Sequence, residues 1–223
     1  MSTAEIRAEL RDLVSGGVAI ADGVAPPLLF VVADAMSGVT TATVVGIGSA
    51  LMITAWRLAR NRGVRFALAG LLGTAFAATV ALRSGSPGVF FLPGIISGSV
   101  TSLVIVLSIA ARRPFVAWTS RLTRGWPLGW YWHPYVRPAY TRTSWIWAMF
   151  FAMRAFIQWR FYVAGDTVAL GVARVVLGWP ALLVLLISTY VLGRRWLVQL
   201  RGPSVDEYQA GSNQPWERQT RGF

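Results

Sequence analysis

The chain has 223 residues, of which 55% are hydrophobic and only 13% are charged, and its formal net charge is +12. Soluble domains average about 25% charged residues, so this composition indicates a membrane protein. The sequence has no cysteine, and His133 is its one histidine, which excludes disulfides, thiolate catalysis and Cys- or His-rich metal sites. We therefore expect neither a metal nor a cofactor.

The first 16 residues predict a short amphipathic lead-in helix at the membrane surface. Ser2 and Glu5 have the spacing of a capping box. Apolar residues then recur at helical intervals, at Ile6, Leu10, Leu13 and Val14. Charged residues stand where the apolar part of a secretion signal would begin, so we expect this segment to skim the membrane rather than to direct export.

Six apolar runs follow, and most are long enough to cross a hydrocarbon core of about 30 Å. They lie at about 17–36, 41–57, 64–82, 88–111, 143–163 and 168–193. The first contains the pair Pro26 and Pro27, which predicts a kink or a break. Residues 17–195 are therefore expected to form an all-α bundle of about six transmembrane helices.

Arginines, which supply every basic residue, set the expected orientation of this bundle. They collect in the connections after the second and fourth runs, whereas the connections after the first, third and fifth carry almost no positive charge. Because short cytoplasmic loops carry the positive excess, we expect both termini to be cytoplasmic, with the chain a multi-pass protein of the bacterial inner membrane.

Two segments outside the apolar runs have distinct compositions. Residues 112–138 mix arginines with aromatic side chains, a pattern typical of the lipid headgroup layer, and next to a membrane this favours anionic lipid over nucleic acid as the partner. The aromatic residues are Trp118, Trp126, Trp130, Tyr131, Trp132 and Tyr135. Residues 196–223 are mostly polar and rich in Gly, Pro and Ser, which predicts a disordered cytoplasmic tail.

Charged and polar residues inside apolar helices are costly in lipid and therefore informative. Trp147, Phe151, Arg154, Gln158 and Tyr162 repeat at helical spacing and should share one face that points into the bundle. Their predicted positions along the spanning helices would place these polar groups and four other charged residues in the outer half of the bundle. Those four are Arg83, Arg174, Asp34 and Asp166.

Two interpretations of this set stay open. The charges either pair with one another and fix the helix register, or they line a pocket for a small polar, anionic or lipid ligand. The candidate ligand-binding residues are Arg154, Gln158, Tyr162, Arg174, Arg83 and Asp34. The segment FFLPGIISG at 90–98 predicts either an unwound helix start or close helix packing at its glycines.

Several longer motifs occur in a fixed order along the chain. They include ALAGLLG before ALRSG, then FFLPGI, ARRPF, WIWAMFFAMRAFIQ and GVARVVLGWP. In this order the chain resembles the actinobacterial integral membrane family known as domain of unknown function 3159, over roughly residues 15–195. The resemblance implies a membrane topology and a host lineage; it implies no catalytic residues.

The expected function is therefore that of a non-enzymatic envelope protein, permease-like or lipid-handling, acting alone or as a homo-oligomer. Membrane lipids are its expected partners, and the arrangement favours no enzyme. The alternative is a membrane-embedded enzyme acting on a prenyl or other lipid substrate. In that alternative Asp34 and Asp22 would supply the carboxyl groups and the aromatic residues of 143–163 would face a developing cation.

Overall fold

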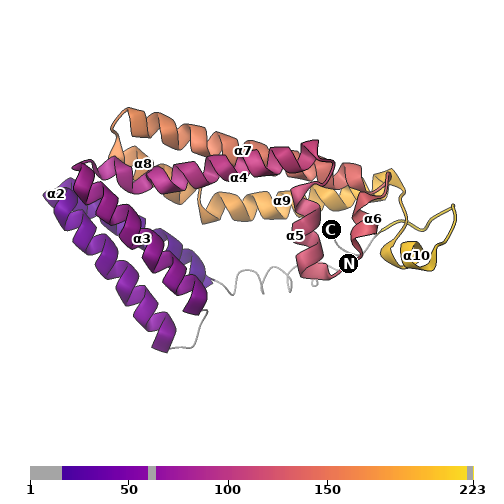
Figure 1. Cartoon of the computed structure of the whole chain (residues 1–223), viewed down its shortest axis with the longest axis horizontal. Helices are drawn as coiled ribbons and strands as arrows, with labels where there is room; N and C mark the ends of the chain where they lie inside the picture. Colours follow the sequence, from indigo (N-terminus) through magenta and orange to yellow (C-terminus); the bar gives the residue numbers. More distant parts are fainter. Residues whose placement is uncertain (1–16, 60–63, 220–222) are drawn as a thin grey trace. The chain divides into compact units, whose positions relative to one another are not determined.

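A computed structural model describes residues 17–59, 64–219 and 223, and every regular element in them is helical (Figure 1). This confirms the all-α fold class. The predicted lead-in at 1–16 lies outside the described residues. The chain divides into two compact units: unit 1 comprises Met1–Gly94 and Ile157–Pro180, and unit 2 comprises Ile95–Phe156 and Ala181–Phe223.

Unit 1 begins with two long apolar helices, α2 (Gly17–Ala59) and α3 (Val64–Ser84), which pack against each other. Helix α2 is interrupted at Gly38, whose backbone angles are φ 79° and ψ 175°. That conformation is almost confined to glycine. The interruption falls between the first two predicted spans, which therefore form the two arms of α2.

The remaining elements of unit 1 are the 3-10 helix η1 (Pro87–Phe91), α8 (Thr167–Val176) and the last turns of α7 (Arg137–Val163). Aromatic packing joins α2 to η1, because the rings of Phe30 and Phe90 stack at 4.0 Å and 11°. A side chain at Gly171 of α8 would overlap Val31 of α2. These close contacts build a small core out of segments far apart in sequence.

Unit 2 contains most of α4 (Leu92–Ala110) and α7, together with α9 (Trp179–Leu200). Two hydrogen bonds tie these helices together. Ser102 Oγ on α4 donates to the carbonyl of Ala148 on α7 at 2.9 Å, and Trp147 Nε1 on α7 bonds Thr189 Oγ1 on α9 at 3.2 Å. Such isolated polar contacts commonly join apolar helices in membranes.

The segment between α4 and α7 folds into α5 (Phe115–Arg124) and α6 (Leu128–Trp132), and it packs with the C-terminal segment. Together they form a buried cluster, here called the linker–tail core. Its members are Ala117, Trp130, Tyr131, Val136, Ala139, Tyr140, Leu197, Val205 and Phe223. Trp130 and Tyr131 are fully buried in it, so these two aromatic side chains do not contact headgroups as the sequence suggested.

The C-terminal segment differs from the disordered tail that its composition predicts. Residues up to Leu200 continue α9, and Val205–Ala210 form α10, with a capping box between Ser204 and Glu207. Trp130 Nε1 donates to the carbonyl of Pro203 at 2.9 Å. The polar composition is outweighed because a few residues of the tail are buried against the aromatic linker.

Three helical stretches are long and apolar enough to cross a membrane among the residues described, and a shorter apolar helix covers Leu71–Ser84. The three are Leu29–Trp56, Pro87–Ala110 and Thr167–Leu200. The predicted single helix over 168–193 is interrupted, since α8 ends at Val176 and α9 begins at Trp179. The count of six spans and the side on which each terminus lies stay predictions.

Candidate functional site

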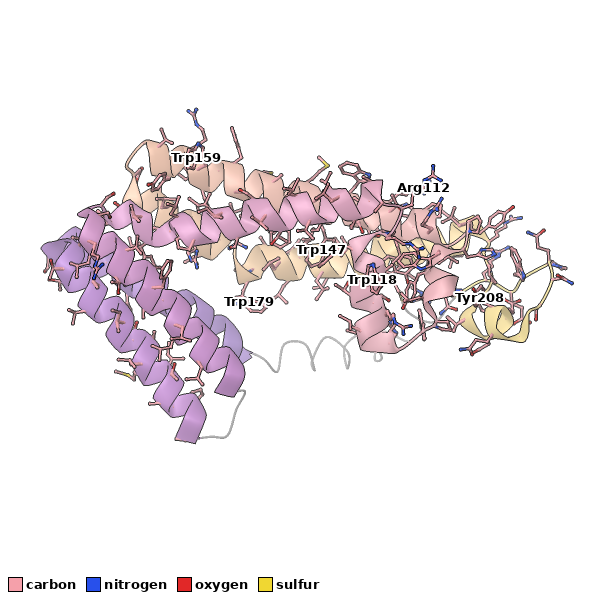
Figure 2. All side chains as sticks on the ribbon, viewed as in Figure 1. Arg112, Trp118, Trp147, Trp159, Trp179 and Tyr208 are labelled. Atoms are coloured by element: carbon pink, nitrogen blue, oxygen red, sulfur yellow. The ribbon has the colours of Figure 1, made fainter. Side chains whose placement is uncertain are left out.

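One face of α7 is withdrawn from the surface along its length. Trp147, Phe151, Arg154 and Tyr162 are half-buried, and Gln158 is fully buried. The other side of the helix is open and, apart from the exposed Arg160, mostly apolar, with Trp159 47% exposed there (Figure 2). Further exposed residues on that side are Met149, Met153, Phe156 and Val163. Arg154, Gln158 and Tyr162 are therefore on the more buried side of α7, as the spacing predicted, whereas Arg142 and Arg160 are exposed.

Gln158 is the most unusual residue of this face. Its side chain is 2% exposed, and its amide nitrogen Nε2 has no hydrogen-bond partner. Leaving a buried donor unsatisfied costs about 1–3 kcal/mol, so native proteins leave few such groups. In the part of the chain that the structure describes, the Tyr140 hydroxyl is the other buried side-chain group in this condition.

Tyr162, one turn beyond Gln158, lies beside η1. A Cβ atom at Gly88 would stand 3.5 Å from Cδ2 of Tyr162 and 3.9 Å from Cδ1 of Leu170. These are ordinary van der Waals distances, so Tyr162 of α7 and Leu170 of α8 both lie against η1. The ring of Trp159 lies 5.5 Å from that of Tyr162.

Arg174, on the last turn of α8, is half-buried against the first turn of α4. Its guanidinium occupies the space that a side chain at Gly94 would need: a Cβ there would overlap Nη1 and stand 3.3 Å from Cζ. Glycine at 94 therefore makes room for a cation. The sequence left an unwound helix start and close packing open for this segment, and the structure shows a 3-10 turn followed by this arginine contact.

The other predicted residues have different surroundings. Arg83 is exposed on the last turn of α3, and Asp34 is half-buried on α2. Asp166 is exposed and caps α8, because its Oδ1 accepts a hydrogen bond from the Ala169 amide at 2.8 Å. Asp22 lies on α2, but its side chain is outside the described set. Asp166 thus has a structural role that its position before a helix could have indicated.

Arg154 belongs to the stretch of α7 in unit 2, whereas Gln158, Tyr162 and Arg174 belong to unit 1. Unit 1 therefore carries three of the predicted groups: a buried amide donor, a phenol and a guanidinium, on α7 and α8. Two glycines that lie against these side chains, Gly88 and Gly94, were not assigned to the site by sequence. Their only signal was the density of Gly and Pro between residues 85 and 98.

Comparison with known proteins gives one match. A family model described as "Protein of unknown function (DUF3159)" matches residues 15–199. No curated protein and no solved structure matches the chain. The matched region includes α2, α3, η1, α4 and α5 to α8, and almost all of α9. The chain belongs to this family of proteins of unknown function.

Proposed function

We propose that this chain is a permease-like or lipid-handling protein of the bacterial inner membrane, and that unit 1 binds a polar or anionic group. The observation that carries the proposal is the amide of Gln158, which is 2% exposed and has an unsatisfied Nε2. A buried donor without an acceptor is explained if an acceptor arrives from outside, as an oxygen atom of a ligand.

The polar groups of unit 1 indicate what kind of ligand would suit it. Gln158 can donate through Nε2, Tyr162 can donate or accept, and Arg174 adds a permanent positive charge. A carboxylate or phosphate would use both a neutral donor and a guanidinium, and charge-assisted hydrogen bonds are the stronger ones. Small organic anions and the headgroups of anionic lipids share this chemistry, so both remain within the proposal.

The apolar helices support a membrane setting for such a site. Pro87–Ala110 and Thr167–Leu200 are both long and apolar enough to span, and they carry Gly94 and Arg174. A cation on a helix of this kind is expected to face protein or a water-filled cavity. Arg174 satisfies that expectation, because its guanidinium packs against α4.

The test uses the purified chain in proteoliposomes. Two processes are measured: movement of a fluorescent phosphatidylglycerol between leaflets, followed by dithionite quenching, and uptake of radiolabelled phosphate or lactate under an imposed gradient. Activity in either assay should fall by about tenfold or more in Arg174→Gln, the loss expected when one charged hydrogen bond is removed. Wild-type protein that supports neither process under any gradient would contradict the proposal.

A matched pair of glycine variants separates the site from general damage. Gly94→Ala places a methyl group where the Arg174 guanidinium lies, and the flexible end of that side chain can move away without disrupting the backbone. Gly73→Ala, on α3, meets nothing within 4 Å. We expect Gly94→Ala to reduce activity with little change in stability, and Gly73→Ala to leave activity unchanged. Equal effects of the two substitutions would argue against a site at Arg174.

A further inference from the structure

Helix α5 has an apolar face that is largely exposed among the residues described, with Phe115 half-buried at its start. Phe115, Trp118 and Leu122 follow at i, i+3 and i+7 and therefore lie on one side of the helix. Trp118 is 43% exposed and Leu122 is 85% exposed. The opposite side is buried in the linker–tail core, with Ala117 at 0% and Ser120 at 7%. The exposed side of α5 is therefore more apolar than its buried side, which is the reverse of the usual amphipathic pattern.

Positive charge borders this exposed face. The ring of Trp132 on α6 lies 5.9 Å from that of Trp118, and the guanidinium carbon of Arg113 stands 4.7 Å above Trp132. Arg113 is itself exposed, as is its neighbour Arg112 at the turn between α4 and α5 (Figure 2). Apolar and aromatic side chains beside arginines match the boundary between acyl chains and anionic headgroups.

The attachment of α5 holds its face in a definite direction within unit 2. Its first two amides are satisfied by side chains of neighbouring helices: Phe115 N donates to Ser108 Oγ at 3.0 Å, and Val116 N donates to Ser144 Oγ at 3.2 Å. The helix runs across the ends of α4 and α7 rather than along them (Figure 1). Because the candidate span Pro87–Ala110 ends just before it, a transverse helix here would lie along a membrane surface.

We propose that the face formed by Phe115, Trp118 and Leu122, together with Trp132 and Arg113, docks on the surface of an anionic lipid bilayer. The sequence pattern suggested that all six aromatic residues of 112–138 contact headgroups. Trp130 and Tyr131 are buried and drop out of this set, whereas Trp118 belongs to the exposed face of α5. Docking at this face rests on unit 2 alone and is independent of the ligand site proposed in unit 1.

The chain has no cysteine, so a single engineered thiol reports one position without background. Leu122→Cys and, as a control, Gln209→Cys on the exposed side of α10 are labelled with an environment-sensitive fluorophore in the full chain. Each is reconstituted in nanodiscs of phosphatidylglycerol or of phosphatidylcholine. We expect the label at 122 to be blue-shifted and quenched by brominated phosphatidylglycerol, while the label at 209 is quenched by aqueous iodide.

A charge variant tests the role of the headgroups. Arg113→Gln should lower the ratio of docked to undocked label at 122 by about fivefold in anionic nanodiscs, the effect of one basic residue at such a surface. Arg218→Gln, in the exposed tail, is the matched control and should change nothing. Equal iodide quenching at 122 and 209 in both lipids would overturn the proposal. So would an intermolecular disulfide between unlabelled Leu122→Cys chains in detergent, because it would show that a second copy covers this face.

Discussion

Buried polar groups have hydrogen-bond partners in much of the linker–tail core of unit 2, whereas the buried amide of α7 in unit 1 lacks one. In the linker–tail core, Trp130 Nε1 donates to the carbonyl of Pro203, and the Val205 amide donates to Gln219 Oε1 at 3.2 Å. In unit 1, Gln158 is as deeply buried, yet its amide nitrogen has no partner. Satisfied groups help to specify one fold, whereas an unsatisfied one leaves a binding capacity unused.

The unsatisfied hydroxyl of Tyr140 in unit 2 has a different explanation from the unsatisfied amide of Gln158 in unit 1. Its hydroxyl also has no partner, but its ring stacks on Phe223 at 4.5 Å and 9° and lies 5.1 Å from the ring of Tyr131. Burial raises the pKa of Tyr140, so this hydroxyl stays protonated. A large aromatic ring accounts for the burial of Tyr140. Gln158 has no ring, and its burial places mainly an amide in the interior.

The largest expected effect is the loss of the linker–tail core. Trp130→Ala removes a fully buried ring that contacts Tyr131 and Tyr140, and should lower the free energy of unfolding by about 3–5 kcal/mol. Denaturant unfolding in mixed micelles measures it. Trp118→Ala, which removes an exposed ring, should cost about 0.5 kcal/mol or less and serves as the control. Equal losses would mean that burial does not distinguish the two positions.

The second effect has the opposite sign and tests unit 1. Gln158→Leu replaces a buried unsatisfied amide by an apolar side chain of similar size, and should raise the free energy of unfolding by about 1–3 kcal/mol while abolishing the proposed binding. The same unfolding assay applies, with Gln199→Leu on the exposed side of α9 as the control. A loss of stability in Gln158→Leu would show that the amide has a structural partner, and the contrast between the units would disappear.

A smaller effect concerns the contact between α4 and α7. Ser102→Ala removes the hydrogen bond to the Ala148 carbonyl and should cost about 0.6 kcal/mol, the average for such bonds between membrane helices. Ser99→Ala is the control, because Ser99 Oγ donates to the carbonyl of Ile95 within its own helix. A cost several times larger in Ser102→Ala would show that this one bond holds unit 2 together.

The smallest effect is local and depends on pH. Hydrogen bonds from the amides of Glu217 and Ser204 lower the pKa of Glu207 from its ordinary value of 4.5. The stability that ionised Glu207 contributes is therefore fully present above pH 4.5 and is lost as the pH falls through the lowered pKa. Amide exchange in α10 should therefore accelerate at acidic pH, as mass spectrometry can record. Glu207→Gln should remove this pH dependence. An unchanged acid response in that variant would assign the effect to another group.

The sequence predicted the elements whose signals are local. Apolar runs marked α3 closely, and the uncharged stretch around Gly38 marked the interruption of α2. The interruption before α9 was missed because hydropathy stays high through Leu177 and Gly178, although Gly-Trp-Pro at 178–180 is a usual breaking signal. Periodicity alone also placed Gln158 and Tyr162 on the buried face of α7.

What escaped prediction depends on distant contacts. The disordered tail was predicted from composition, without use of the capping-box spacing of Ser204 and Glu207. The hydrogen bond of Trp130 to the Pro203 carbonyl joins residues 73 positions apart. The contact of Arg174 with Gly94 likewise joins two helices that no local pattern relates. The composition of a segment does not show which distant residues it contacts, and those contacts decide whether the segment is ordered.

The interruption of α2 has a consequence for chain length. The two arms of α2 are joined at Gly38, the residue with non-helical backbone angles. The second arm directs Thr43, Ala50 and Thr54 to the interior, and each of these residues is 5% exposed. One residue rotates a helix by about 100°, so a single insertion after Gly38 would swing this row out of its contacts and bring another row inward. An insertion or deletion next to Gly38 should therefore be more damaging than many substitutions there, and natural relatives should keep the same number of residues between the two arms of α2.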